Sequence, residues 1–252
     1  MKSIFLCLVT ASVVQAADKT PFQIALSVQQ KGRSGIHVIN PDGSDSRRLT
    51  KNRNDTSPRW SPDGKQIAFL SLRKQDHELA EEHDLAFHWF LYVMDADGQH
   101  QRRVTKTPFF MIFQWSPDGS RFLFQSSYED RTNKGKEGAV SSAIYVMNAD
   151  GMKQKRLTPI NKIDSFPAWS PDGKQIAFTS NRDGNMDIYV MKADGSDIRR
   201  LTSNKADDMN LIWSPDGKKI AFTSFRRQGG GSVYSVGVEG VGESWLSDSG
   251  MP

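Results

Sequence analysis

The sequence predicts an all-β fold: a β-propeller of four-stranded antiparallel blades, with four full blades and a partial N-terminal blade. Three observations support this prediction. The motif Trp-Ser-Pro-Asp-Gly occurs four times, starting at Trp60, Trp115, Trp169 and Trp213. A short apolar run follows each copy, as in Ile176-Ala177-Phe178. Most copies are then followed by a run like Tyr-Val-Met, an Asp-Gly pair and a run like Arg-Leu-Thr. Repetition at this period is typical of propellers and solenoids.

Each repeat contains four short strands, which we call a to d in chain order. Strand a ends at the Trp, and Ser-Pro-Asp-Gly forms the turn to strand b. Proline presets φ at the second turn position, and glycine supplies the conformation that other residues avoid. The apolar run is strand b, the Tyr-Val-Met run is strand c, and the Arg-Leu-Thr run is strand d. Asp-Gly marks the turn between strands c and d.

These residues carry a resemblance to a known family. The unit from Pro167-Ala168-Trp169-Ser170-Pro171-Asp172-Gly173 to Arg200-Leu201-Thr202 resembles the TolB-type β-propeller repeat, over residues 22–247. That repeat occurs in periplasmic TolB proteins and in the propellers of prolyl-oligopeptidase-like peptidases. TolB proteins place an α/β domain before the propeller, and here the propeller repeats begin soon after residue 16. The resemblance implies a propeller fold and a role in a cell-envelope complex similar to Tol–Pal.

The N-terminus is typical of an export signal. A basic Lys2, an apolar stretch and the small-residue site Val14-Gln15-Ala16 predict a signal peptide at 1–16 and a propeller domain at 17–252. The apolar stretch is too short to span a bilayer as a helix. Cys7 is the only cysteine and lies in this segment, so no thiol chemistry is expected in the mature protein. We therefore expect a periplasmic or secreted protein without a stable membrane span.

The first repeat has no Trp strand. Residues 22–50 align with strands b, c and d of the regular repeat, and no strand a precedes them. The C-terminal tail after Leu246 is expected to cover that edge only in part, because Ser247-Asp248-Ser249-Gly250 is poor strand sequence. We expect unpaired backbone groups along residues 22–28 and a weak junction at this edge.

Two long insertions suggest a binding face. Both lie between strands b and c, at 72–86 and 127–142, and insertions on one face of a repeat protein often mark where it binds. The candidate binding face combines the first insertion, the loops before strand a and one b–c turn. Its residues are Asp55, His77, Glu81, His83, Asp84, His88, Asp164, Arg182, Asp183 and Asp208.

Each group of candidates has a structural and a functional interpretation. The insertion from His77 to His88 is either a solvated acidic loop, which we favour, or a set of zinc ligands, although its spacing is not His-Glu-x-x-His. Asp183 lies in a segment that superficially resembles a calcium loop and fits a hairpin turn better. Asp55, Asp164 and Asp208 each precede a Trp by five residues. They either cap loop amides or form a ring of carboxylates that holds a cation or a basic group of a partner.

The function expected from these patterns is non-enzymatic binding. The net charge is +4, and the cations at the start of strand d are spread over the sheet edges, which argues against a nucleic-acid face. The sequence has no Gly-x-Ser-x-Gly motif and no α/β segment, so a peptidase is not expected. We expect a monomeric module, without catalytic residue, cofactor or metal, that binds a protein or peptide partner in the cell envelope. The alternative is a metal-dependent or hydrolytic enzyme whose site lies at the mouth of the central channel that propeller blades surround.

Overall fold

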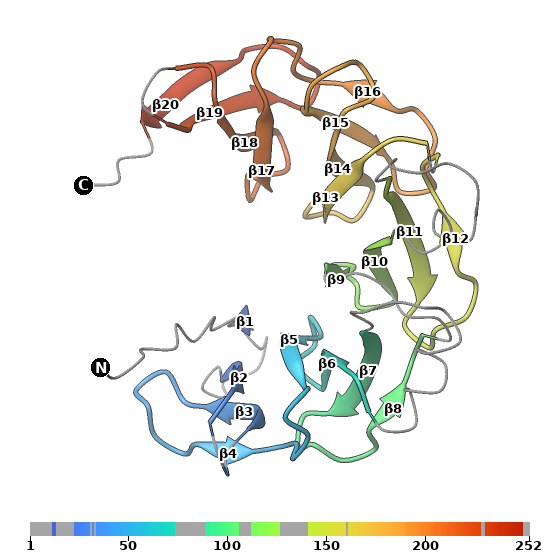
Figure 1. Cartoon of the computed structure of the whole chain (residues 1–252), viewed down its shortest axis with the longest axis vertical. Helices are drawn as coiled ribbons and strands as arrows, with labels where there is room; N and C mark the ends of the chain where they lie inside the picture. The colour runs from blue at the N-terminus through green and yellow to red at the C-terminus, as the bar shows by residue number, and fades with distance from the viewer. Residues whose placement is uncertain are drawn as a thin grey trace. The chain divides into compact units, whose positions relative to one another are not determined.

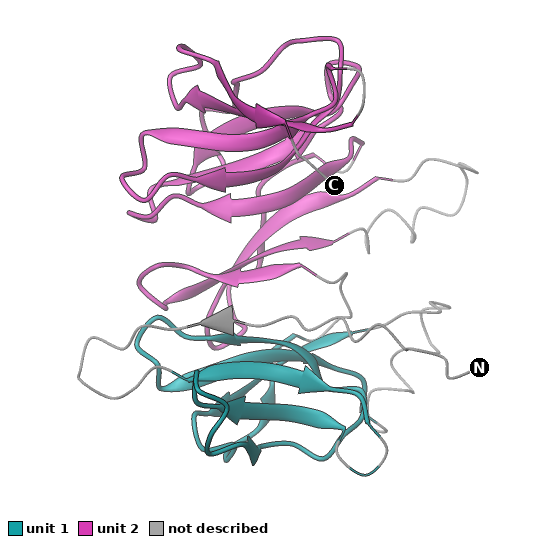
Figure 2. Ribbon diagram, turned by 90° about the vertical axis from the view of Figure 1, so that its left-hand side faces the viewer, with its two compact units in different colours: residues 1–111 teal, residues 112–252 magenta. Residues whose placement is uncertain are grey.

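The computed structural model describes residues 12–13, 23–30, 32, 34–73, 89–105, 112–126, 141–159, 161–227 and 230–248. All regular elements in these ranges are β-strands, arranged as five four-stranded sheets (Figure 1). The chain divides into two compact units, residues 1–111 and 112–252 (Figure 2). No helix long and apolar enough to cross a bilayer occurs in the described ranges. These sheets confirm the predicted all-β blades.

Unit 1 contains the first two blades. Each is a sheet in which consecutive strands pair antiparallel. The first blade consists of β1 (Ser12–Val13), β2 (Ile24–Val28), β3 (Gly35–Ile39) and β4 (Arg47–Arg48). The second consists of β5 (Thr56–Trp60), β6 (Gln66–Ser71), β7 (Phe90–Asp95) and β8 (Arg102–Arg103).

Unit 2 contains three blades with the same strand order. Blade 3 consists of β9 (Phe113–Trp115), β10 (Arg121–Ser126), β11 (Ala143–Asn148) and β12 (Lys155–Arg156). Blade 4 consists of β13 (Asp164–Trp169), β14 (Gln175–Ser180), β15 (Asp187–Lys192) and β16 (Arg199–Arg200). Blade 5 consists of β17 (Asp208–Trp213), β18 (Lys219–Ser224), β19 (Ser232–Gly237) and β20 (Ser244–Asp248).

The Ser-Pro-Asp-Gly turns repeat one hydrogen-bond pattern. In blade 4 the hydroxyl of Ser170 donates to Asp172 at 2.6 Å and accepts from the N–H of Gln175 at 2.9 Å. Asp172 also accepts from the N–H of Lys174 at 3.1 Å. Gly173 has a φ of 69°, where a Cβ would be strained. The turn residues are therefore required by the geometry that joins strands a and b.

Strand d is short and is held by a threonine. Only two residue pairs join β15 to β16, and the hydroxyl of Thr202 then accepts the N–H of Ile188 at 3.0 Å. The leucine between them, Leu201, is buried against the next blade. This explains the Arg-Leu-Thr pattern: arginine at the sheet edge, leucine in the core and threonine as a substitute for a ladder bond. Thr50, Thr105 and Thr158 make the same bond in blades 1, 2 and 3.

The core lies between successive blades of a unit, because the two faces of each strand bury different side chains. Ile176 and Phe178 of β14 pack with Leu123 and Ile144 of blade 3. The alternate residue, Ala177, packs instead with blade 5. In unit 1 the same arrangement packs aromatic residues of blade 2 onto blade 1. Because successive side chains of a strand point to opposite faces, each blade packs one face on the preceding blade and the other on the following blade of its unit, where these are present.

The tryptophans of strand a are not equally buried. The repeat pattern predicts that the Trp of every strand a is buried between adjacent blades, and Trp60 and Trp169 are buried in these cores. Trp115 and Trp213 are only partly buried, so the prediction is wrong for these two copies. Trp213 instead donates its indole N–H to the carbonyl of Ala168 at 3.1 Å.

The first blade obtains a fourth strand from an unexpected segment. β1 pairs with β2 through two residue pairs, Ser12 with Ala25 and Val13 with Ile24. This segment belongs to the range 1–16 that the sequence assigns to a signal peptide, which remains a prediction. Because only two residues pair, most of β2 has no strand partner on that side among the described residues.

Candidate functional site

The three aspartates that precede strand a each face an arginine at the end of strand b. Asp55 faces Arg73, and the equivalent pairs are Asp164 with Arg182 and Asp208 with Arg226. All three carboxylates are completely buried. We call each of these an Asp–Arg pair.

A β-bulge in strand a accompanies each aspartate. The register shifts between Ser165 and Ala168 in β13, and the residue two positions after the aspartate, Phe166, has a φ of 51°. Ser57 and Asn210 occupy the same position with φ of 52° and 54°. A bulge of this kind bends the strand and changes the direction of neighbouring side chains. The same register shift occurs in β5 and β17, so in these three strands the bulge accompanies an Asp–Arg pair.

In unit 2 the Asp–Arg pairs are closed by hydrogen bonds. Arg182 donates to both oxygens of Asp164 at 3.0 and 3.1 Å. Its guanidinium carbon lies 4.8 Å from the ring centre of Tyr189. Arg226 donates to both oxygens of Asp208 at 3.3 and 3.4 Å. These carboxylates have partners for both oxygens, and each arginine is also held against an aromatic face.

Blade 4 extends its pair into a larger polar network. Asp187, at the start of β15, is fully buried and accepts from Arg200 at 2.6 Å. Burial raises the pKa of Asp187, and Arg200 opposes that rise. The hydroxyl of Tyr189 donates to Asp183. The pKa of Tyr189 is raised, mainly by burial and secondly by this hydrogen bond. Asp183 thus accepts a hydrogen bond from Tyr189 and forms an ion pair with Arg200 at 3.8 Å.

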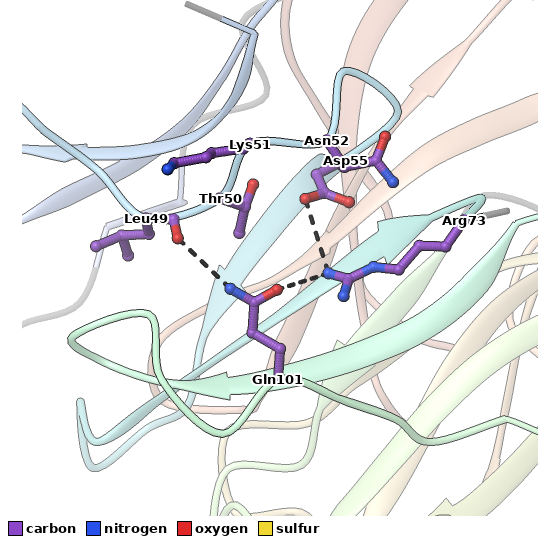
Figure 3. A pocket seen from close by; sticks show the side chains of 7 residues that line it. All are labelled: Leu49, Thr50, Lys51, Asn52, Asp55, Arg73 and Gln101. Carbon is purple, nitrogen blue, oxygen red and sulfur yellow. Dashed lines mark hydrogen bonds and ion pairs between the residues drawn. The ribbon is translucent and has the colours of Figure 1, made fainter. Parts of the chain in front are cut away.

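In unit 1 the pair is open and borders a pocket. Arg73 stays 3.8 Å from Asp55 and donates instead to the Oε1 of Gln101 at 2.7 Å. Its guanidinium carbon lies 4.3 Å from the ring centre of Tyr92. The pocket has a volume of about 440 Å³. Figure 3 shows its lining, which consists of Leu49, Thr50, Lys51, Asn52, Asp55, Arg73 and Gln101.

Asp55 has an unusual environment for a carboxylate. Among the described residues no donor makes a hydrogen bond of acceptable geometry to either oxygen. Burial raises the pKa of Asp55, and the nearby hydroxyls of Ser71 and Thr50 and the charge of Arg73 oppose the rise. A buried polar group without a hydrogen bond carries a desolvation penalty of about 1–3 kcal/mol. Asp55 is thus a buried carboxylate that borders the pocket and whose oxygens accept no hydrogen bond from the described residues.

The structure places the predicted binding-face residues in three groups. Asp164 with Arg182, and Asp183 next to them, form the closed network of blade 4. Asp208 is closed by Arg226 and by Asn204, which donates at 2.6 Å. Asp55 alone of the three aspartates borders the pocket. His77, Glu81, His83, Asp84 and His88 lie outside the described residues.

Sequence reasoning missed Arg73, Arg226 and Gln101. A signal for the arginines was present, because each lies 18 residues after its aspartate, as Arg182 does after Asp164. The pairing was neither of the two arrangements considered for the aspartates, amide caps or a carboxylate ring. In the described part of the chain, no three His, Cys, Asp or Glu side chains come together as a metal-binding group.

Comparison with known proteins identifies relatives over most of the chain. Residues 80–251 match the family described as TolB beta propeller domain. A solved structure of TolB from Acinetobacter baumannii superposes with a TM-score of 0.61 and 24% identity, covering 96% of this chain and 53% of that one. The uncharacterized peptidase YuxL of Bacillus subtilis is 29% identical over 51% of this chain and 22% of its own length. Dipeptidyl-peptidase 5 of Porphyromonas gingivalis is 37% identical over 29% of this chain and 10% of its own length.

These comparisons correct the expectation that the protein is not an enzyme. Two relatives are named peptidases, and this chain spans less than a quarter of the length of either. The missing Gly-x-Ser-x-Gly motif was therefore no ground for excluding the peptidase branch, since a propeller can match a protein whose chemistry lies elsewhere in its chain.

Proposed function

The chain belongs to the family of TolB beta propeller domains, and on that premise we propose that it binds a peptide or protein segment for a peptidase-like enzyme. In this proposal the propeller supplies recognition, and the bound segment is the substrate on which hydrolysis acts. The observation that carries the proposal is the open Asp55–Arg73 pair and its pocket of about 440 Å³. Ligand pockets typically measure about 300–1,000 Å³ and carry a few placed polar groups.

The contrast between the two units supports the choice of this pocket. Equivalent Asp–Arg pairs in blades 4 and 5 are closed by direct hydrogen bonds. In blade 2 Arg73 donates to Gln101 and lies 3.8 Å from Asp55. Arg73 and Asp55 therefore line a pocket without a direct hydrogen bond between them. The insertion with His77, Glu81, His83, Asp84 and His88 follows Arg73 directly in sequence, and we include it in the proposed binding face.

The cellular setting of the proposal is the cell envelope. A signal peptide at 1–16 would deliver the domain of residues 17–252 to the periplasm or the exterior. A partner protein there, bound as in a Tol–Pal-like complex, is the second candidate function. The fold match to a TolB structure favours it.

One experiment tests both candidates. Purified protein is immobilised and exposed to a tryptic digest of envelope proteins and, separately, to the intact extract. Retained material is identified by mass spectrometry, and heat-denatured protein serves as the control surface. Retention of peptides supports the peptidase-like role, and their cleavage over time in the same sample would support it further. Retention of one intact protein without peptides supports the second candidate, and retention equal to the control contradicts both.

Deletion of residues 74–86 tests the binding face separately. The deletion begins just after Arg73 and leaves the residues that line the pocket in place. We expect weaker retention with an unchanged thermal melting curve. Unchanged retention would remove the insertion from the binding face.

A further inference from the structure

The pocket in unit 1 has the charges and the acceptor that suit one end of a peptide. Its lining contains two cations, Lys51 and Arg73, and one acid, Asp55. An incoming group with a single negative charge balances this set, whereas an ammonium group would add to an excess of positive charge. In a partly buried site this difference matters more than it does in bulk water.

The carboxylate oxygens of Asp55 indicate a second feature of the ligand, a hydrogen-bond donor. Asp55 needs a hydrogen-bond donor, because no described residue supplies one of acceptable geometry. A neutral N–H meets that need without changing the charge balance. A peptide C-terminus carries both groups side by side: a carboxylate, and the backbone N–H of the last residue.

We propose that this pocket binds the C-terminal end of a peptide, with its carboxylate on Arg73 and Lys51 and its last backbone N–H on Asp55. The inference rests on the proposed function, since it names which part of the peptide is bound. Arginine is well suited to carboxylates because its planar guanidinium matches their geometry. Gln101 at 2.7 Å and the Tyr92 ring hold that guanidinium in place before a ligand arrives.

The lining of the pocket suits a short chain end. Leu49 and Thr50 line it from the end of blade 1, and Gln101 lies between the carbonyl oxygen of Leu49 and the guanidinium of Arg73 (Figure 3). Gly98 lies against Leu49 so closely that an added Cβ would be 3.0 Å from the Leu49 carbonyl oxygen. A volume of about 440 Å³ accommodates one or two residues, not a long segment.

The test compares peptides that differ only at their ends. N-acetylated tripeptides ending in Ala, Leu, Phe or Lys are titrated into the purified protein as free acids and as C-terminal amides, and binding is followed by NMR chemical-shift changes. A fifth probe, trialanine amide with a free N-terminus, offers an ammonium and no carboxylate. We expect at least one free acid to bind ten-fold or more tightly than its amide, and the ammonium probe to bind no better than the amides.

Variants assign the effect to the pocket. Arg73→Gln should abolish the preference for free acids, with folding checked by circular dichroism. Lys51→Gln, at an exposed side chain, should weaken binding of free acids several-fold without affecting folding. The matched control is Lys205→Gln, an exposed lysine in the loop before the closed Asp208–Arg226 pair, and we expect it to bind as the unaltered protein does.

The outcomes separate this inference from the function on which it rests. If acids and amides bind equally, or if Lys51→Gln and Lys205→Gln behave alike, the C-terminal site is wrong while peptide binding stands. Tighter binding of the ammonium probe would overturn the assignment of the chain end. If no peptide binds at all, the proposed function fails together with the inference.

Discussion

Arg182 donates from one guanidinium nitrogen to both carboxylate oxygens of Asp164, at 3.0 and 3.1 Å, and Asp164 is completely buried. Replacing Arg182 by Met would leave that charge buried without its partner. We expect a loss of roughly 3 kcal/mol in the free energy of unfolding, measured with urea. The double variant Arg182→Met with Asp164→Leu should recover much of this loss, because the orphaned charge is gone.

The open pair provides the comparison. Arg73 is 3.8 Å from Asp55, so Arg73→Met should cost less, about 1 kcal/mol. Equal losses at the two sites would show that the open and closed pairs do not differ in solution.

Trp169 is predicted to be a major contributor to the stability of unit 2. It is buried between blades 3 and 4, with Leu123, Ile144 and Ile176 in the same cluster. Trp169→Ala should lower the free energy of unfolding by about 3–5 kcal/mol, because it removes buried area and leaves a cavity. Trp213→Ala should cost less, since that ring is only partly buried. A melting temperature unchanged in Trp169→Ala would refute the packing between these blades.

Gly98 and Gly43 separate backbone strain from close packing. Both have a φ near +90°, at +91° and +86°. An added Cβ at Gly98 would lie 3.0 Å from the carbonyl oxygen of Leu49, whereas at Gly43 nothing lies within 4 Å. Gly43→Ala should therefore cost only the conformational strain, about 1 kcal/mol, and Gly98→Ala measurably more. Equal thermal shifts in the two variants would mean that the Leu49 contact is relaxed in solution.

The turn aspartates should make the protein sensitive to acid. The hydroxyl of Ser116, followed by the N–H of Ser120, lowers the pKa of Asp118 from 3.8 to about 2. A carboxyl whose pKa is lower in the folded state stabilises the fold above its unfolded pKa, and this contribution is lost as the pH falls through the folded pKa. Stability should thus decline between pH 3.8 and about 2. Asp63, Asp172 and Asp216 have pKa values shifted in the same direction by their turn serines.

Ser116→Ala tests the cause. It removes the largest contribution, so NMR titration should show a higher pKa for Asp118 and a shallower acid dependence of stability. Ser44→Ala is a control at a turn outside the Ser-Pro-Asp-Gly motif, and it should leave Asp118 unchanged. An Asp118 pKa that stays near 2 in Ser116→Ala would assign the shift to other groups.

The edge of β2 should exchange faster than its counterpart in blade 4. β14 pairs with β13 through residues at both ends of the strand, whereas β2 pairs with β1 only at Ala25 and Ile24. Amides of residues 24–28 should therefore exchange with deuterium faster than those of residues 176–180. Removal of residues 1–16 should widen the difference, because β1 is lost. Equal protection in both forms would show that β2 is covered in another way.

The sequence by itself determined the blades. Trp169-Ser170-Pro171-Asp172-Gly173 specifies a turn through contiguous residues, and the alternation of Ile176, Ala177 and Phe178 assigns alternate side chains to the two blade contacts. Such information is local, because turn chemistry and strand period depend on neighbours within a few residues. For the same reason the repeated spacing predicted the blades and the order of strands a to d, but not strand β1 of the first blade.

Only the tertiary structure decided the candidate site. Asp55 and Arg73 occupy the same repeat positions as Asp164 and Arg182, yet one pair is open and the other closed. The difference depends on Gln101, which lies just before β8 and accepts a hydrogen bond from Arg73, and on Leu49 and Lys51 at the end of the preceding blade. β1 likewise pairs where the repeat pattern has no strand. These features arise from side chains that meet only after the blades pack, so no local pattern encodes them.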